Sequence, residues 1–179
     1  MAANFTGCAD IEDVIRRRAF DQCSCARCAD LCTGVPGVYD PAHLGRLLDG
    51  GDMSLTDLVS TCVMDEWPMS SARGSSTYYI RPRTTAEQGG TRVRDREPNA
   101  RCVHLGSAGC ALQRTHMPLE CVSTYACRDN YLLSGRPLDP TDLTPYWFCS
   151  GLGRLLWETS TGIDLISRLE SHFPRKNRQ

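Results

Sequence analysis

Cysteine is the residue type best able to do chemistry in this chain, which has eleven cysteines among 179 residues. Most of them fall into two groups. The first is spaced Cys23-x-Cys25-x2-Cys28-x3-Cys32, and the second Cys102-x7-Cys110-x10-Cys121, with Cys127 six residues further on. Thiols grouped in this way are typical ligands of zinc ions or of iron–sulfur clusters.

The spacing within the first group favours iron over zinc. Short gaps beside Gly34, Pro36 and Gly37 let a loop gather several thiolates around one point, while backbone N–H groups offset the negative charge of sulfur. Structural zinc sites more often take paired Cys-x2-Cys ligands from two hairpins, whereas iron–sulfur clusters often take three ligands from one compact run and a fourth from a distant cysteine. Zinc remains the alternative.

Several function classes are disfavoured by composition. No run of eighteen apolar residues is present, so no membrane span is expected. A net charge of -1 lacks the positive field that non-specific nucleic-acid binding needs. The first residues resemble no secretory signal, so we expect a cytoplasmic protein whose thiols are reduced and bind metal. A disulfide-stabilised exported protein is a further alternative.

The elements that must position the cysteines are read from hydrophobic spacing and capping residues. These features predict helices over residues 10–20, 41–48 and 55–63, from Pro118 to Ala126, from Pro145 to Leu156, and over 163–173. Residues 77–80 and 91–94 are predicted to pair as a small hairpin. Residues 21–39 are expected to be a loop, and the arginine-rich stretch from Arg81 to Arg101 a solvated one.

The expected fold is therefore mainly α, with long irregular loops and one small β-hairpin. We expect a single domain over residues 1–179, organised by metal, with a cysteine-cluster core over 22–128. C-terminal helices over 129–173 and a frayed tail over 174–179 would follow. Cys62 falls in an apolar helical stripe and is predicted to be a buried, unreactive thiol.

Several segments together resemble a known family. They are Cys25-Ala-Arg-Cys28-Ala-Asp-Leu-Cys32, the Pro41-Ala-His-Leu44 helix, Cys102-Val-His-Leu105, Gly109-Cys110-Ala-Leu112 and Pro118-Leu-Glu-Cys121. In order and spacing they resemble the YkgJ-type cysteine-cluster proteins, a family described as zinc- or iron-chelating domains, and the resemblance covers residues 22–128. That family is distantly similar to the flagellin lysine methylase group, which implies an iron–sulfur cluster. This chain departs from the family pattern where Thr33 replaces the second of two adjacent cysteines.

Spacing and resemblance together rank the candidate ligands. Cys25, Cys28 and Cys32 come first, and Cys121 is the expected fourth ligand because a helix start favours its thiolate. Cys102 and Cys110 follow closely, so the predicted metal-binding set is Cys25, Cys28, Cys32, Cys102, Cys110 and Cys121. Six thiols exceed the four that one cluster or one zinc ion uses, so some do not ligate or a second metal is present.

Other residues add little chemistry. Cys23 and Cys127 are reserve ligands, whereas Cys8 and Cys149 are expected to be packing or surface residues. His104 and His116 could replace a thiolate, but a lone histidine more often forms hydrogen bonds or faces solvent. No acid–base pair identifies a catalytic residue, so the sequence leaves open whether the protein is an enzyme.

Two main functions remain from this reasoning. In the first, thiolates hold a [4Fe-4S] cluster in a cytoplasmic protein that transfers electrons to a redox partner or modifies a peptide or protein substrate. In the second, zinc staples an interaction module that has no catalytic role.

Overall fold

The computed structural model describes residues 32–33, 36–67, 77–94, 100–118, 120–121 and 155–175. Its α-helices are α3 (Pro41–Asp49), α4 (Leu55–Thr61) and α8 (Ser160–Leu169), and its 3-10 helices are η1 (Arg114–His116), η2 (Leu155–Glu158) and η3 (Glu170–His172). The strands are β1 (Cys62–Trp67), β2 (Thr77–Pro82), β3 (Arg92–Val93), β4 (Leu105–Gly106) and β5 (Gly109–Cys110). The predicted helix over 10–20 lies outside the described residues, as do most residues of the two predicted helices that begin at Pro118 and Pro145. Six cysteines also lie outside them: Cys8, Cys23, Cys25, Cys28, Cys127 and Cys149.

The described residues form an α+β fold, so the expectation of a mainly α protein is wrong. β1 lies at the centre of a three-stranded sheet with the order β2-β1-β3. It pairs antiparallel with β2 and parallel with β3, where Met64 lies opposite Arg92. Residues 77–80 and 91–94 do contain strands, but these strands flank β1 instead of pairing with each other. The predicted hairpin is therefore also wrong.

The central strand is not predicted from the sequence, because its first residues continue the hydrophobic spacing of the helix before it. Leu55, Leu58 and Cys62 recur at helical spacing, but α4 ends just before Cys62, which begins β1. Both faces of β1 are covered, so Val63 and Met64 are equally buried although they point to opposite sides. The two-residue alternation that would mark a half-buried strand is therefore lost.

Capping residues set the starts of the first two described helices as predicted. At the start of α3, Oδ1 of Asp40 accepts the backbone N–H of His43 at 2.9 Å. At the start of α4, Oγ of Ser54 accepts the backbone N–H of Asp57 at 3.0 Å. These bonds satisfy donors that the helix itself leaves unpaired.

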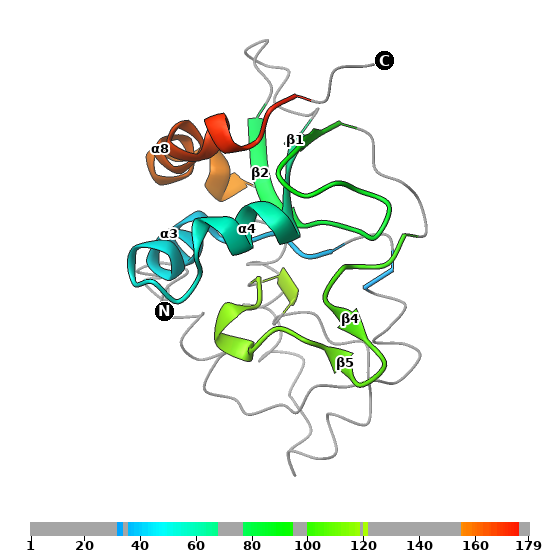
Figure 1. The fold of residues 1–179 in the computed structure, drawn as a ribbon. Helices are drawn as coiled ribbons and strands as arrows, with labels where there is room; N and C mark the ends of the chain where they lie inside the picture. Colours follow the sequence, from blue (N-terminus) through cyan, green and yellow to red (C-terminus); the bar gives the residue numbers. More distant parts are fainter. Residues whose placement is uncertain are drawn as a thin grey trace, which may run out of the picture.

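The helices α3, α4 and α8 gather on one side of β1 and β2, as Figure 1 shows. Between them lies a core of buried side chains: Val38, Tyr39, Leu44, Leu47, Leu58, Met64, Tyr79, Ile80, Trp157, Leu165, Leu169 and Phe173. α8 overlaps the last predicted helical stretch, 163–173, but begins three residues before it, at Ser160. It buries Leu165 and Leu169, whereas Ile163, expected on its apolar face, is 55% exposed.

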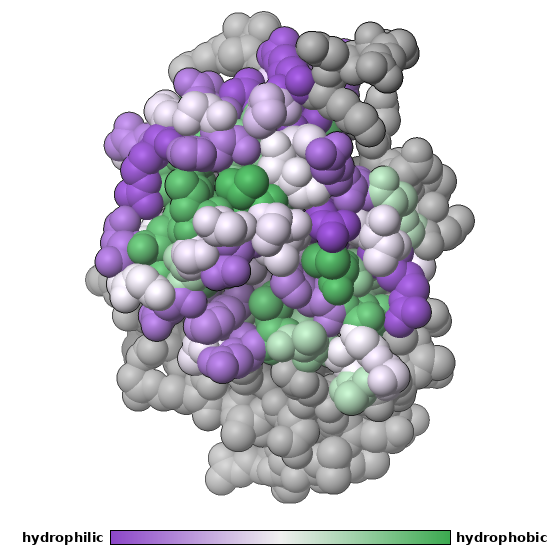
Figure 2. Space-filling model, in the orientation of Figure 1, coloured by the Kyte–Doolittle hydropathy of each residue, from purple (hydrophilic) through white to green (hydrophobic). Residues whose placement is uncertain are grey.

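Large hydrophobic side chains are also found on the surface. In Figure 2 hydrophobic residues form small patches among hydrophilic ones. Among the described residues, the exposed large hydrophobic ones are Leu55, Leu155 and Ile163. Scattered exposure of this kind is ordinary for a folded domain. Within the described part of the chain, no helix is long and apolar enough to cross a membrane.

A buried arginine holds β1, β2 and the turn after β2 together. Nε of Arg81 donates to Oδ2 of Asp65 at 2.7 Å, and Nη2 of Arg81 donates to Oε1 of Glu87 at 2.6 Å. Burial alone would raise the pKa of Glu87, but Arg81 and the backbone N–H of Thr84 bring that pKa below its usual 4.5. Arg81 is fully buried, so the expectation that the arginine-rich stretch is a solvated loop is wrong at this position.

Replacing Arg81 by Met should lower the free energy of unfolding by about 3–5 kcal/mol, because Asp65 and Glu87 would stay buried without a cation. Arg168→Met is the matched control. Nη2 of Arg168 lies 3.0 Å from Oδ1 of Asp49, and both side chains are more than half exposed, so that pair contributes at most about 1 kcal/mol. Urea unfolding measures both changes, and equal losses would contradict the structural role given to Arg81.

Candidate metal centre

Four of the six predicted ligands lie among the described residues. Cys32, Cys102, Cys110 and Cys121 are free thiols, with Cys102 buried and the other three half-buried. The remaining predicted ligands, Cys25 and Cys28, lie outside the described residues, as do the reserves Cys23 and Cys127. The structure therefore bears on one part of the predicted site.

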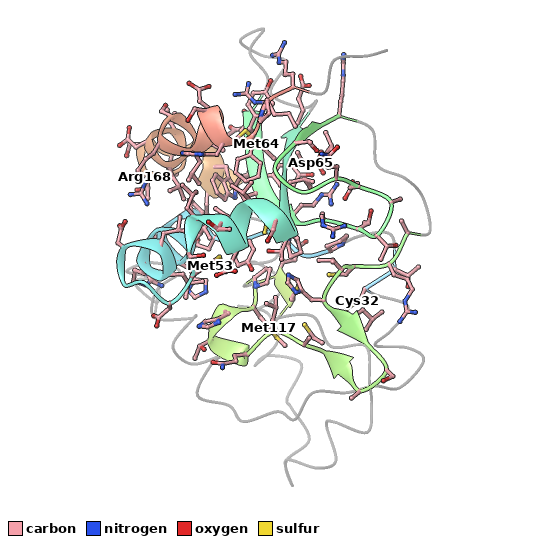
Figure 3. All side chains as sticks on the ribbon, viewed as in Figure 1. Cys32, Met53, Met64, Asp65, Met117 and Arg168 are labelled. Atoms are coloured by element: carbon pink, nitrogen blue, oxygen red, sulfur yellow. The ribbon has the colours of Figure 1, made fainter. Side chains whose placement is uncertain are left out.

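The end of the first cysteine group lies against the start of the second. The backbone N–H of Cys102 donates to the carbonyl oxygen of Cys32 at 2.8 Å. Next to this bond, Thr33 forms an antiparallel bridge with Arg101. Figure 3 shows Cys32 near the β4–β5 hairpin that follows Cys102 in the chain. Two cysteines far apart in the sequence are thus neighbours in space.

A small hairpin returns Cys110 toward Cys102. β4 and β5 pair antiparallel, with Leu105 opposite Cys110 and Gly106 opposite Gly109. Gly109 has a φ of 101°, which favours glycine at this turn. The backbone N–H of Leu105 donates to the carbonyl oxygen of Cys102 at 3.0 Å, so the start of the hairpin is tied to the first cysteine of this group.

Cys121 lies against the backbone of Gly37. A Cβ atom built on Gly37 would be 2.5 Å from Sγ of Cys121 and 2.8 Å from its backbone nitrogen, so a glycine is needed for this close approach. Beside it, Oε2 of Glu120 accepts the backbone N–H of Val38 at 2.7 Å. The chain segment that precedes α3 therefore contacts the last cysteine of the predicted ligand set.

Three of these sulfurs accept a hydrogen bond from a backbone N–H group. Gly37 donates to Cys121, and the other two donors are the residues two positions after Cys102 and Cys110, which are His104 and Leu112. Backbone donors aimed at sulfur offset negative charge on a thiolate, and they are one of the means by which proteins tune metal–sulfur sites.

The thiols also oppose one another's ionisation. Burial raises the pKa of all four, to about 11 for Cys102. Cys32 and Cys110 raise the pKa of Cys102 further, and all three raise the pKa of Cys121. The sulfurs thus lie within electrostatic range of one another. A cation bound among them would oppose this repulsion and favour ionised thiols.

A complete ligand set is not assembled by the described residues alone. Among residues 32–33, 36–67, 77–94, 100–118, 120–121 and 155–175, no three His, Cys, Asp or Glu side chains are arranged to hold a metal ion. The chemistry of the gathered donors fits a soft metal centre, because thiolates with backbone N–H partners are its usual ligands. Any centre in this region would need further ligands or a closer approach of these thiols.

The side chain of His104 is expected from the sequence to form hydrogen bonds or to face solvent, but one of its ring nitrogens does neither within the described structure. Its Nε2 atom is buried and has no hydrogen-bond partner in the described part of the chain. Burial, and then the positive charge of Arg83, lower the pKa of His104, so its imidazole is neutral at pH 7. A neutral imidazole can accept a hydrogen bond or ligate a metal. His116 is half-buried in η1.

Two polar groups that sequence analysis does not identify lie in the same region. Oη of Tyr39 and Oγ1 of Thr84 are buried, and neither has a hydrogen-bond partner among the residues described. Thr84 forms an antiparallel bridge with Cys102. The sequence carries no signal for either group, since both fall in segments expected to be loops.

Cys62 stands apart from the predicted ligands. It is fully buried at the start of β1, which confirms the prediction of a buried thiol. Its sulfur lies 3.8 Å from Oγ1 of Thr61, and burial raises its pKa to about 12. A thiol with so high a pKa is protonated at neutral pH and unreactive.

No protein-family model matches the chain, and comparisons with curated proteins and with solved structures give no match. The resemblance to YkgJ-type proteins therefore stays a prediction.

Replacing Gly37 by Ala should lower the free energy of unfolding by about 1–3 kcal/mol, because the new methyl group overlaps Cys121 and its backbone. Gly45→Ala is the control, since a Cβ atom there meets nothing within 4 Å and alanine stabilises a helix interior by about 0.5–1 kcal/mol relative to glycine. Thermal and urea unfolding measure both variants. A Gly37→Ala protein as stable as the wild type would contradict the close packing of Gly37 on Cys121.

Proposed function

We propose that this chain is a cytoplasmic metal-binding protein whose cysteine thiolates hold a [4Fe-4S] cluster. The observation that carries the proposal is the convergence of Cys32 with Cys102, Cys110 and Cys121, which brings both cysteine groups to one region. In this proposal Cys25, Cys28, Cys32 and Cys121 are the ligands, with Cys102 and Cys110 as alternative or additional ones.

The surroundings of these thiols support a metal–sulfur centre. Backbone N–H groups of Gly37, His104 and Leu112 point at three of the sulfurs and would offset the charge of bound thiolates. Cys102 is buried and its neighbours are half-buried, so the protein limits access of water to this region. Hydrogen bonding and burial are two of the factors that set the reduction potential of such a centre.

The proposed role is redox chemistry. A bound iron–sulfur cluster supplies one-electron transfer. The protein would supply the hydrogen bonds and burial that orient and tune the centre. Its partner would be a redox protein, or a peptide or protein substrate that is modified. The spacing of three cysteines in one compact run, Cys25 to Cys32, favours iron.

A zinc-stapled interaction module is the second candidate. The β4–β5 hairpin favours it, because structural zinc sites often take ligands from hairpins, and Cys102 and Cys110 lie before and at the end of this one. In such a module the metal contributes folding energy and takes no part in a reaction.

Elemental and sulfide analysis of anaerobically purified full-length chain separates these candidates. We expect iron together with acid-labile sulfide, and a brown protein that absorbs broadly near 400 nm. A colourless protein that carries stoichiometric zinc would overturn the iron assignment in favour of the zinc module. A protein that contains neither metal, even after anaerobic reconstitution, would overturn both.

Replacing Cys121 by Ser should strongly lower the metal content of the purified chain, because the hydroxyl is a poorer ligand and the centre loses one of its four proposed ligands. The matched control is Cys62→Ala, which removes a buried thiol outside the predicted ligand set. It should keep the metal content of the wild type even where it lowers stability. Equal loss of metal from both variants would contradict the assignment of Cys121 to the centre.

A further inference from the structure

Among the described residues, some buried polar side-chain atoms are left without a hydrogen-bond partner. Three such side-chain atoms are found in the described part of the chain, namely Oη of Tyr39, Oγ1 of Thr84 and Nε2 of His104. Thr84 bridges to Cys102, and the backbone N–H of His104 donates to the sulfur of Cys102. Because buried polar groups almost always have hydrogen-bond partners, each of these exceptions calls for an explanation, such as a group that bonds to it.

Tyr39 is the most strongly constrained of the three. Its backbone N–H donates to the carbonyl oxygen of Ile80 at 3.1 Å, and its carbonyl oxygen accepts Nε1–H of Trp157 at 2.8 Å. The residue is completely buried. These bonds fix the backbone of Tyr39 on the core, so its Cα atom cannot move away from the core without breaking them.

The ring of Tyr39 lies in the electrostatic neighbourhood of several sulfurs. Burial raises the pKa of Tyr39 well above 10, and four cysteines raise that pKa further: Cys62, Cys121, Cys102 and Cys110. The phenol therefore keeps its proton at neutral pH and can act as a donor. Three of these four cysteines belong to the predicted ligand set.

We propose that the Tyr39 hydroxyl donates a hydrogen bond to a metal-bound sulfur of the cysteine centre and thereby tunes that centre. This inference rests on the proposed metal-binding function. A metal-bound thiolate or sulfide keeps lone pairs and is a good acceptor, whereas the neutral thiols among the described residues leave the hydroxyl without a partner. Donation to sulfur withdraws negative charge, so it stabilises the reduced form of an iron–sulfur cluster and raises its midpoint potential.

Tyr39→Phe tests this inference, because it removes the hydroxyl and keeps the ring. The full-length chain is studied in two forms, metal-free after chelation and reconstituted anaerobically with ferrous iron and sulfide. In the metal-free form we expect Tyr39→Phe to unfold at the same urea midpoint as the wild type or a higher one, because an unpartnered buried hydroxyl is removed. In the reconstituted form we expect a lower urea midpoint than that of the wild type.

Tyr79→Phe is the matched control. Oη of Tyr79 donates to Oδ2 of Asp65 at 3.0 Å within the described structure, without any metal. Removing this hydroxyl should therefore lower the urea midpoint by the same amount in both forms. The midpoint potential of the reconstituted protein, measured by reductive titration, gives a second readout. It should shift to a lower value in Tyr39→Phe and stay unchanged in Tyr79→Phe.

The outcomes distinguish this inference from the function on which it rests. A wild type that takes up neither iron nor zinc overturns the proposed function and, with it, the role of Tyr39. Suppose instead that the wild type takes up metal. If Tyr39→Phe then changes the urea midpoint equally in both forms and leaves the midpoint potential unchanged, only the role of Tyr39 is overturned.

Discussion

Residues 36–40, the short segment before α3, are packed against both the hydrophobic core and the cysteine region, and the arrangement of both depends on this segment. Toward the core, Tyr39 bonds through its backbone to β2 and to the indole of Trp157. Toward the cysteines, the backbone N–H of Val38 donates to Glu120, and Gly37 lies against Cys121. Residues 36–40 are all buried. A residue with a larger side chain at Gly37, or a break in the Tyr39 bonds, would disturb the core and the cysteine region together.

The chain beyond the end of β2 provides a second connection between these regions. The backbone N–H of Val103 donates to the carbonyl oxygen of Arg83 at 3.0 Å, and that of Thr85 donates to the carbonyl oxygen of Arg101 at 2.7 Å. Cys102 lies between these two bonded positions and bridges to Thr84. Because β2 is itself fixed by the buried ion pairs of Arg81, the backbone of Cys102 is held by a well-fixed part of the fold.

Short-range features of this fold could be predicted from the sequence, whereas long-range ones could not. The start of α3 follows from Asp40 because capping is a local interaction. The central strand could not be predicted, because the burial of Asp65 within it depends on an ion pair with Arg81 on another strand. In the candidate site, cysteine spacing indicates which thiols form a group. Tyr39 and Thr84 carry no such signal, because only tertiary packing leaves a hydroxyl buried without a partner.

X-ray absorption spectroscopy at the metal edge, on anaerobically purified full-length chain, tests most directly whether cysteine sulfur atoms hold a metal centre. For either metal the account predicts a first coordination shell dominated by sulfur, at about 2.3 Å if the metal is zinc. A first shell made of oxygen and nitrogen alone would contradict the account.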